Sequence, residues 1–349
     1  KDMHFLNRTN TVQNWRYAVI LRRILLLTVL CPLYFSTVPA KPRELLVVEK
    51  KSNSVGFYTV EGKRVTGVAV GKHPHEMVLS PDEDRVYVSD NGVLWMTYAG
   101  QGGNTISILD VRERKKVGVI DLGNYRRPHG MDVDPRTGRL VVTIENPDGL
   151  LLVDPGERKV IRKYDVQGDS PHMVTLGPRA QWAYVSNTGS GTVTAVHLES
   201  GEVKLIPTDA RPQGGVLSLD GRLLYLTNSD GNSISIIDTE KKERVGTIKT
   251  GQGPGRIALT PDGKQLVYNL QAGAAVGFAE VHSRKQIGSV SLAGPPLSLH
   301  LSADGRWAYT GVQSLDKVYI ISVAEKKIVR VIDTPESAGP DSVVAVNAQ

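Results

Sequence analysis

The sequence predicts an all-β protein, a seven-bladed β-propeller in which each blade has four antiparallel strands. Three observations support this prediction: a repeat of about 42 residues, four short apolar segments within each repeat, and an incomplete repeat at each end of residues 41–349. A repeat of about 40 residues that contains four strands is typical of propeller blades. No segment after residue 40 shows the period of an amphipathic helix.

The repeat is marked by a proline that follows a glycine or a polar residue. Successive prolines of this kind are separated by 54, 43, 41, 42, 42 and 44 residues. They are Pro74, Pro128, Pro171, Pro212, Pro254, Pro296 and Pro340.

Each repeat contains the same series of short strands. In one of them a strand at 257–259 is followed by the turn 260–264, which contains Asp-Gly, the strongest short-range signal for a hairpin. In the repeat before it, a tyrosine-containing strand at 224–226 is followed by strands at 234–238 and 245–248. Four short strands with tight polar turns therefore form one predicted blade.

The two ends of the propeller region complement each other. Residues 45–70 supply only the last three strands of a blade, whereas residues 341–346 follow an anchor proline and have the pattern of a first strand. Pairing these segments completes a seventh blade and removes two unpaired sheet edges. We therefore expect the C-terminal strand to close the ring.

Residues 1–40 form a predicted leader, separate from a single propeller domain at 41–349. Arg22 and Arg23 precede the apolar run 24–30, and Val38 and Ala40 form a small-residue cleavage site. An uncleaved anchor helix remains the alternative. Since no later segment is long and apolar enough to span a membrane, we expect a periplasmic or secreted protein, most simply a monomer.

The leader also accounts for most of the charge and for the only cysteine, Cys31. It carries five basic residues and one acidic residue, so residues 41–349 contribute only +2 of the net charge of +6. A thiol-free domain of low net charge excludes disulfides and thiolate metal sites, and it does not favour nucleic acid as a partner.

The tyrosine-containing strands resemble the YVTN repeat family of propellers. The resemblance rests on residues 87–90, 184–187 and 225–228, together with 233–239 and 251–254, and it extends over about residues 45–349. It implies a propeller fold. It does not imply one function, because similar propellers include surface-layer proteins, nucleic-acid-binding periplasmic proteins, lactonase-like enzymes and electron-transfer domains that carry haem or a metal.

Three histidines occupy the same position of three consecutive repeats. His75, His129 and His172 each follow an anchor proline, and Arg127 and Arg211 each precede one. Because the first strand of a blade is innermost in a propeller, we expect these side chains at one mouth of the central channel, with His129 and His172 facing a common space. Arginine and imidazole donors there would bind a small anion.

The same histidines have two other interpretations. Neutral imidazoles could instead hold a divalent metal, although no carboxylate or fourth histidine of the sequence must join them. Alternatively, they only bond neighbouring carbonyl groups.

An insertion of about a dozen residues at 91–104 lengthens the first full repeat. It carries Trp95, Met96 and Tyr98 between glycines, so it either packs over the channel mouth or contacts a protein partner. Asp90, just before it, is an expected neighbour of His75.

A binding protein is the preferred interpretation, and whether any substrate is turned over stays open. The resemblance implies one alternative, a metal-dependent lactonase-like hydrolase that would use Glu145, Asn146 and Asp148, although Asn-Pro-Asp-Gly is also an ordinary turn sequence. A second alternative is an electron-transfer propeller with a haem or metal bound through one of the three histidines. Covalent haem is excluded, since no Cys-x-x-Cys-His sequence is present.

Overall fold

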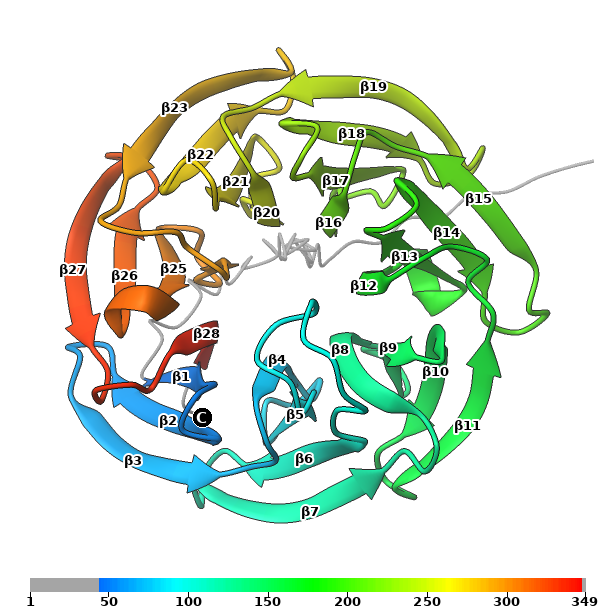
Figure 1. Cartoon of the computed structure of the whole chain (residues 1–349). Coiled ribbons are helices and arrows are strands. Elements are labelled where there is room, and N and C mark those ends of the chain that lie inside the picture. Colours follow the sequence, from blue (N-terminus) through cyan, green and yellow to red (C-terminus); the bar gives the residue numbers. More distant parts are fainter. Residues whose placement is uncertain (1–43, 347–349) are drawn as a thin grey trace, which may run out of the picture. The chain divides into compact units, whose positions relative to one another are not determined.

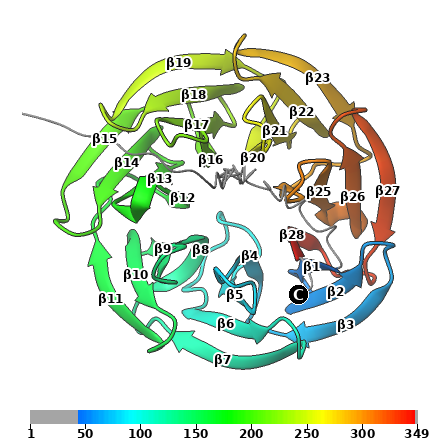
Figure 2. The same cartoon turned by 180° about the vertical axis from the view of Figure 1, so that it is seen from behind.

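The structure is a computed structural model that describes residues 44–346. The predicted leader, residues 1–40, lies outside the described residues. Within the described part the chain forms seven four-stranded antiparallel sheets arranged in a ring around a central axis (Figures 1 and 2). The predicted seven-bladed propeller is therefore confirmed. No helix in residues 44–346 is long and apolar enough to cross a membrane.

We number the blades in chain order and give their strands from the axis outward. Blade 1 consists of β28 (Pro340–Val346), β1 (Glu44–Glu49), β2 (Ser54–Thr59) and β3 (Arg64–Ala69). Blade 2 consists of β4 (Pro74–Leu79), β5 (Arg85–Asp90), β6 (Thr105–Asp110) and β7 (Lys115–Asp121). Blade 3 consists of β8 (Arg126–Val133), β9 (Leu140–Asn146), β10 (Asp148–Asp154) and β11 (Lys159–Tyr164).

The remaining four blades repeat this order. Blade 4 consists of β12 (Pro171–Leu176), β13 (Trp182–Asn187), β14 (Thr192–His197) and β15 (Val203–Pro207). Blade 5 consists of β16 (Pro212–Leu217), β17 (Leu223–Asn228), β18 (Ser233–Asp238) and β19 (Glu243–Lys249). Blade 6 consists of β20 (Pro254–Leu259), β21 (Gln265–Leu270), β22 (Ala275–Glu280) and β23 (Lys285–Ser291). Blade 7 consists of β24 (His300–Leu301), β25 (Trp307–Val312), β26 (Lys317–Ser322) and β27 (Lys327–Asp333).

Short 3₁₀ turns occur at Pro178–Ala180 and Gln313–Leu315. The first strand of blade 7 is reduced to two residues. Pro295 and Pro296 stand just before it and have no N–H to donate to a sheet ladder.

Blade 1 closes the ring as the sequence predicted. β28 pairs with β1 in antiparallel register, so that Leu45 lies opposite Ala345 and Leu46 opposite Val344. The two segments are almost 300 positions apart in the sequence, and their pairing covers an edge that each would otherwise expose.

The core lies between the blades rather than on the axis. Tyr87, Tyr184, Tyr225 and Tyr309 occupy the same position on the second strands of four blades, and all are buried. Apolar residues of neighbouring blades pack with these strands, as β4 does with β1 and β28. Because the blades are fixed by this packing, the first strands hold their polar residues in defined places around the channel.

Candidate functional site

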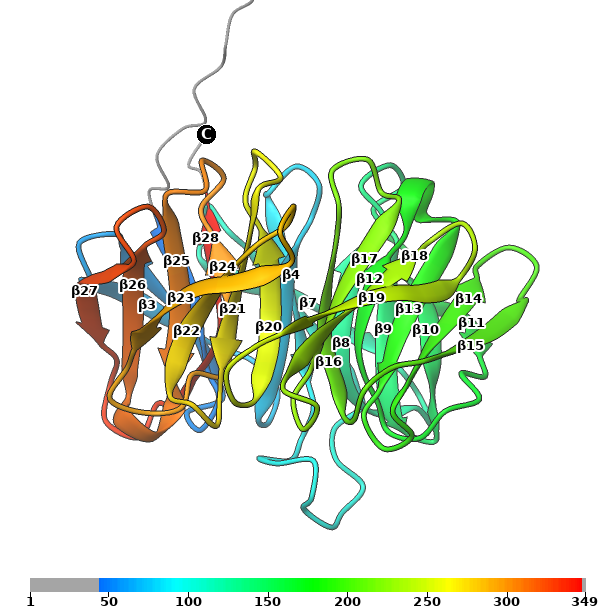
Figure 3. The same ribbon diagram turned by 90° about the horizontal axis from the view of Figure 1, so that it is seen from above.

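The candidate site lies at one mouth of the central channel. Except in blade 7, where β24 begins at His300, each first strand begins there at its anchor proline or within two residues of it. The loop 91–104 between β5 and β6 follows β5 at the same end of blade 2. Figure 3 shows one loop that extends well beyond the others on a single face of the ring. Residues far apart in the sequence therefore meet at this mouth.

The three histidines do converge. The ring centroids of His75 and His129 are 4.6 Å apart and those of His129 and His172 are 4.2 Å apart, both in edge-to-face contact. All three side chains are buried. Burial lowers the pKa of each imidazole well below its usual value of 6.5, so the cluster is neutral at pH 7.

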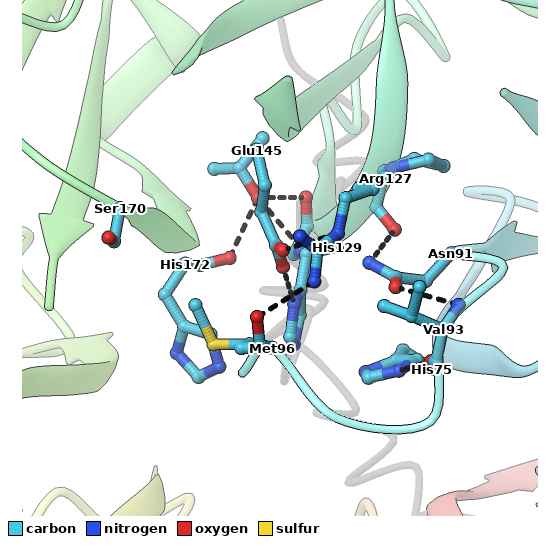
Figure 4. Close-up of polar contacts among 12 residues, drawn as sticks. His75, Asn91, Val93, Met96, Arg127, His129, Glu145, Ser170 and His172 are labelled. Atoms are coloured by element: carbon cyan, nitrogen blue, oxygen red, sulfur yellow. Dashed lines mark hydrogen bonds and ion pairs between the residues drawn. The ribbon is translucent and has the colours of Figure 1, made fainter. Parts of the chain in front are cut away.

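Hydrogen bonds fix the tautomers of two of these imidazoles. His75 donates from Nε2 to the carbonyl oxygen of Val93 at 3.0 Å, which leaves Nδ1 to accept from Lys50 Nζ at 3.3 Å. His129 donates from Nδ1 to Glu145 Oε1 at 2.7 Å when that carboxylate is ionised. His172 differs, because its buried Nδ1 has no hydrogen-bond partner in the part of the chain that the structure describes (Figure 4).

Three ion pairs surround the channel close to the histidines. The first lies beside His75, the second beside His129, and the third joins blade 2 to blade 6 across the axis. In this order, the three ion pairs are Lys50–Asp341 at 3.0 Å, Arg127–Glu145 at 3.1 Å and Arg256–Glu76 at 2.9 Å. Sequence reasoning missed Lys50, Glu76 and Arg256 as members of this network.

Glu145 has an unusual environment. Its side chain is 5 % exposed, and burial raises the pKa of its carboxyl to about 7, against the opposing effect of Arg127. Near neutral pH this group exists in both protonation states, so the charge at the mouth depends on pH in the physiological range.

The two arginines that precede anchor prolines have left-handed backbone conformations. Their φ angles are 56° for Arg127 and 57° for Arg211, whereas blades 6 and 1 place Gly253 and Gly339 at the same position. His73 and Ser170 have the same left-handed conformation at this position of blades 2 and 4, with φ of 44° and 56°, so it is a repeated feature of the blade turn and does not mark the arginines. Arg127 is part of the network described above, but the exposed Arg211 side chain has no partner among the described residues.

A polar pocket of about 750 Å³ opens beside the histidine cluster, between the loop 91–104 and blades 3 to 5. Arg127, Arg211 and Met96 line it, together with two carboxylates, Asp148 and Asp230, that form no ion pair with a residue of 44–346. Two more carboxylates line it, Glu145 and Asp209, which are paired with Arg127 and Arg244. The lining also contains five hydroxyl groups, those of Thr97, Ser170, Thr188, Ser190 and Thr208.

The loop 91–104 is fastened over the mouth. Arg127 donates from Nη2 to the carbonyl oxygen of Met96 at 2.9 Å, Asn91 donates to that of Pro128 at 3.1 Å, and the Lys50 ammonium lies 5.2 Å from the Trp95 ring centroid. Trp95 and Tyr98 nevertheless stay 40 % and 51 % exposed. The loop thus covers the mouth and also presents aromatic surface outward. Asn91 was not among the expected site residues.

Asp90 has its hydrogen bonds within blade 2. Its carboxylate accepts from the N–H of Gly71 at 2.8 Å and from the hydroxyls of Thr105 and Ser107 at 2.7 and 2.8 Å. Asn187 of blade 4 occupies the corresponding place and donates to Thr192 and Thr194. Asp90 therefore forms the same kind of contact to the third strand of its blade as Asn187 does in blade 4, and none of the hydrogen bonds named here joins it to His75.

The described residues offer no ready site for a hard cation such as a divalent metal ion. In residues 44–346, no group of three or more His, Cys, Asp or Glu side chains is arranged to hold a metal ion. Of the residues in the lactonase alternative, Glu145 is engaged by Arg127 and His129, while Asn146 is exposed at the start of the β9–β10 hairpin.

No protein-family profile and no curated protein matches the sequence. Among solved structures, a protein of unknown function from Desulfotomaculum acetoxidans is similar, with a TM-score of 0.74 and 14 % identity over 88 % of this chain and 100 % of that one. The periplasmic gluconolactonase of Pseudomonas aeruginosa has a TM-score of 0.70 and 15 % identity over 87 % of this chain and 99 % of that one. Hydrazine synthase of Kuenenia stuttgartiensis has a TM-score of 0.63 and 19 % identity over 75 % of this chain and 86 % of that one. At these identities the similarity establishes the propeller fold alone.

Proposed function

We propose that this chain is an exported binding protein whose propeller mouth holds a small anion that carries hydroxyl groups. The observation behind the proposal is the exposed Arg211 guanidinium, which lines the polar pocket and has no side-chain partner within residues 44–346. A guanidinium offers two parallel donors to a carboxylate or phosphate. It is therefore the group that we expect to anchor the ligand's anionic end.

The rest of the pocket sets the remaining chemistry of the ligand. Asp148 and Asp230 are hydrogen-bond acceptors when ionised. Five serine and threonine hydroxyls line the pocket; those of Thr188 and Thr208 already donate to the carbonyl oxygens of Ser170 and Gly191, so they can still accept from a ligand. These carboxylates would repel an anion that lacked donors, but a ligand with several hydroxyl groups satisfies them. A hydroxylated carboxylate fits this combination better than a bare inorganic anion does.

The export and family proposals rest on separate observations. The leader sequence at 1–40 and the periplasmic gluconolactonase among the structural neighbours support a periplasmic or secreted location. The buried tyrosines of the second strands support membership of the YVTN-repeat propellers. The exposed Trp95 ring lies outside the polar pocket, so a protein partner could contact it while the pocket holds its ligand.

A screen by thermal unfolding tests the proposed function. A ligand that binds only the folded chain raises its melting temperature as the ligand concentration increases. We expect gluconate to stabilise the protein, with glucose, which lacks the charge, giving little effect and inorganic phosphate a weaker one. No stabilisation by any small carboxylate would overturn the proposal. Hydrolysis of a lactone by the same protein would instead favour the lactonase-like alternative.

A further inference from the structure

The polar pocket at the mouth contains more acidic than basic side chains. Its basic members are Arg127 and Arg211. Its acidic members are Glu145, Asp148, Asp209 and Asp230. An anion that enters a pocket with excess negative charge is repelled unless it brings a compensating group of its own.

Ion pairs cancel part of these charges. Arg127 is paired with Glu145 at 3.1 Å, and Asp209 is paired at 2.6 Å with Arg244, which does not line the pocket. The members without an ion pair to a residue of 44–346 are Arg211, Asp148 and Asp230. One cation and two carboxylates are therefore left for a ligand. At pH 8, above the pKa of about 7 that burial gives Glu145, the pocket has one negative charge in excess.

The free cation and one of the free carboxylates come from blades that are not neighbours. Arg211 immediately precedes β16 of blade 5, whereas Asp148 begins β10 of blade 3. Blade 4 lies between them and contributes the loop 188–191 to the lining. Asp230 lies at the Arg211 end, because the N–H of its neighbour Ser229 donates to the Arg211 carbonyl oxygen at 2.9 Å. A ligand that contacts both Arg211 and Asp148 must cross the hydroxyl groups of blade 4.

The negative charge of Asp148 is incompletely compensated. Its Oδ2 accepts the N–H of Ser170 at 3.0 Å, and its Oδ1 has no hydrogen-bond partner among the described residues. Partial burial raises the pKa of this carboxyl, and the nearby carboxylates of Asp169 and Glu145 act in the same direction. Because like charges surround it, a cationic group placed at Asp148 is favourable.

We propose that the ligand of this pocket is a zwitterion, in which a hydroxylated chain separates a carboxylate bound by Arg211 from an ammonium group bound by Asp148. This inference rests on the proposed function, because it uses the same pocket and the same anchor. The ammonium group removes the excess negative charge and donates to the free Oδ1 of Asp148. The hydroxyls of Thr188 and Ser190 line the pocket between the two charged ends. An amino-sugar acid whose amine is remote from its carboxylate has this combination of groups.

Calorimetric titration with two matched ligands tests this inference. Gluconate and 6-amino-6-deoxygluconate differ only at the terminal carbon, where the second compound carries an alkyl amine that is protonated at pH 8. At low ionic strength we expect the parent protein to bind the amino compound about three- to tenfold more tightly, since the gain lies between those of an exposed ion pair and of a hydrogen bond to a charged group. Asp148 is exposed, so the preference should decrease as salt is added. 6-Acetamido-6-deoxygluconate, which lacks the positive charge, should show no preference over gluconate.

Asp148→Asn is the test variant, because asparagine keeps an acceptor for the Ser170 N–H but carries no charge. It should bind gluconate and 6-amino-6-deoxygluconate with equal affinity. Asp165→Asn is the matched control. Asp165 is an exposed carboxylate of the same blade that also accepts one backbone N–H, from Gln167 at 3.0 Å, and it does not line the pocket. This variant should keep the parental preference, and melting curves establish that both variants are folded.

The outcomes separate this inference from the proposed function. Equal affinity of the parent for gluconate and the amino compound, or an undiminished preference in Asp148→Asn, would overturn the zwitterion while leaving anion binding at Arg211 intact. Failure of both ligands to bind the parent would overturn the proposed function, and this inference with it.

Discussion

Glu145 Oε1 lies 2.7 Å from His129 Nδ1, and the other oxygen of the same carboxylate lies 3.1 Å from Arg127 Nε. Arg127 in turn holds the carbonyl oxygen of Met96 at 2.9 Å. One buried carboxylate thus connects the imidazole cluster of the channel to the loop that covers its mouth.

The first prediction concerns this loop. Replacing Arg127 by alanine removes the hydrogen bond to Met96 and leaves Glu145 without its cation, so we expect the loop 91–104 to open more often. Limited proteolysis should then cut within 91–104 several-fold faster than in the parent protein. Arg126→Ala is the control, since Arg126 lies on the same strand without a side-chain partner among the described residues. Equal cleavage rates in both variants would show that Arg127 does not hold the loop.

The second prediction concerns pH and the buried imidazoles. The pKa of His172 is lowered on folding, first by burial and further by His129 and Arg256, so below about pH 6.5 the unfolded chain binds a proton that the folded chain does not. The stability due to the neutral His172 is therefore present above pH 6.5 and is lost as the pH falls, by up to about 1.4 kcal/mol per pH unit.

Urea unfolding at pH 6.5 and 4.5 measures this loss. His172→Gln should lose less stability between the two pH values than the parent, and glutamine is the residue that blade 5 carries at this position, Gln213. His282→Gln, in an exposed turn, serves as the control. The raised pKa of Glu145 acts in the opposite direction in both proteins, so it cancels in the comparison. An identical acid loss in His172→Gln and the parent would contradict the account.

The fold and the site differ in how far the sequence predicts them. The blades follow from local signals, namely anchor prolines, Asp-Gly turns and tyrosine strands, which recur with a fixed period. The meeting of His75, His129 and His172 also follows, since the repeat places them at one structural position. Lys50 carries no such signal, because it occupies a β1–β2 turn whose charged sequence is ordinary for a surface. Its burial depends on closure by β28, which brings Asp341 to within 3.0 Å.

The third prediction concerns that buried ion pair. The Lys50 and Asp341 side chains are 3 % and 9 % exposed, so Lys50→Met leaves a buried carboxylate without a partner. We expect a loss of about 3–5 kcal/mol in the free energy of unfolding, measured with urea, and recovery of most of it when Asp341→Asn is added. Lys159→Met, in an exposed pair with Glu157, should change little. The prediction is wrong if the double variant is no more stable than Lys50→Met alone.

The fourth prediction concerns ring closure. A chain that ends at Gly339 lacks β28, which leaves the apolar strand β1 as an uncovered inner edge of blade 1. We expect this chain to aggregate or to melt without a cooperative transition, whereas a chain that lacks only residues 347–349 should melt like the parent. Cooperative melting of the shorter chain near the parental temperature would show that closure by β28 is dispensable.

The most direct test of the proposed function is calorimetric titration of gluconate into the parent protein, Arg211→Ala and Arg222→Ala. Arg222 is an exposed arginine of the same blade at the opposite end of β16, so it matches the charge change without touching the pocket. A hydrogen bond to a charged group contributes about 1.5–3 kcal/mol. We therefore predict one site per chain, with binding at least tenfold weaker in Arg211→Ala and unchanged in Arg222→Ala. Equal binding by all three proteins, or an equal loss in both variants, would contradict a ligand site at the propeller mouth.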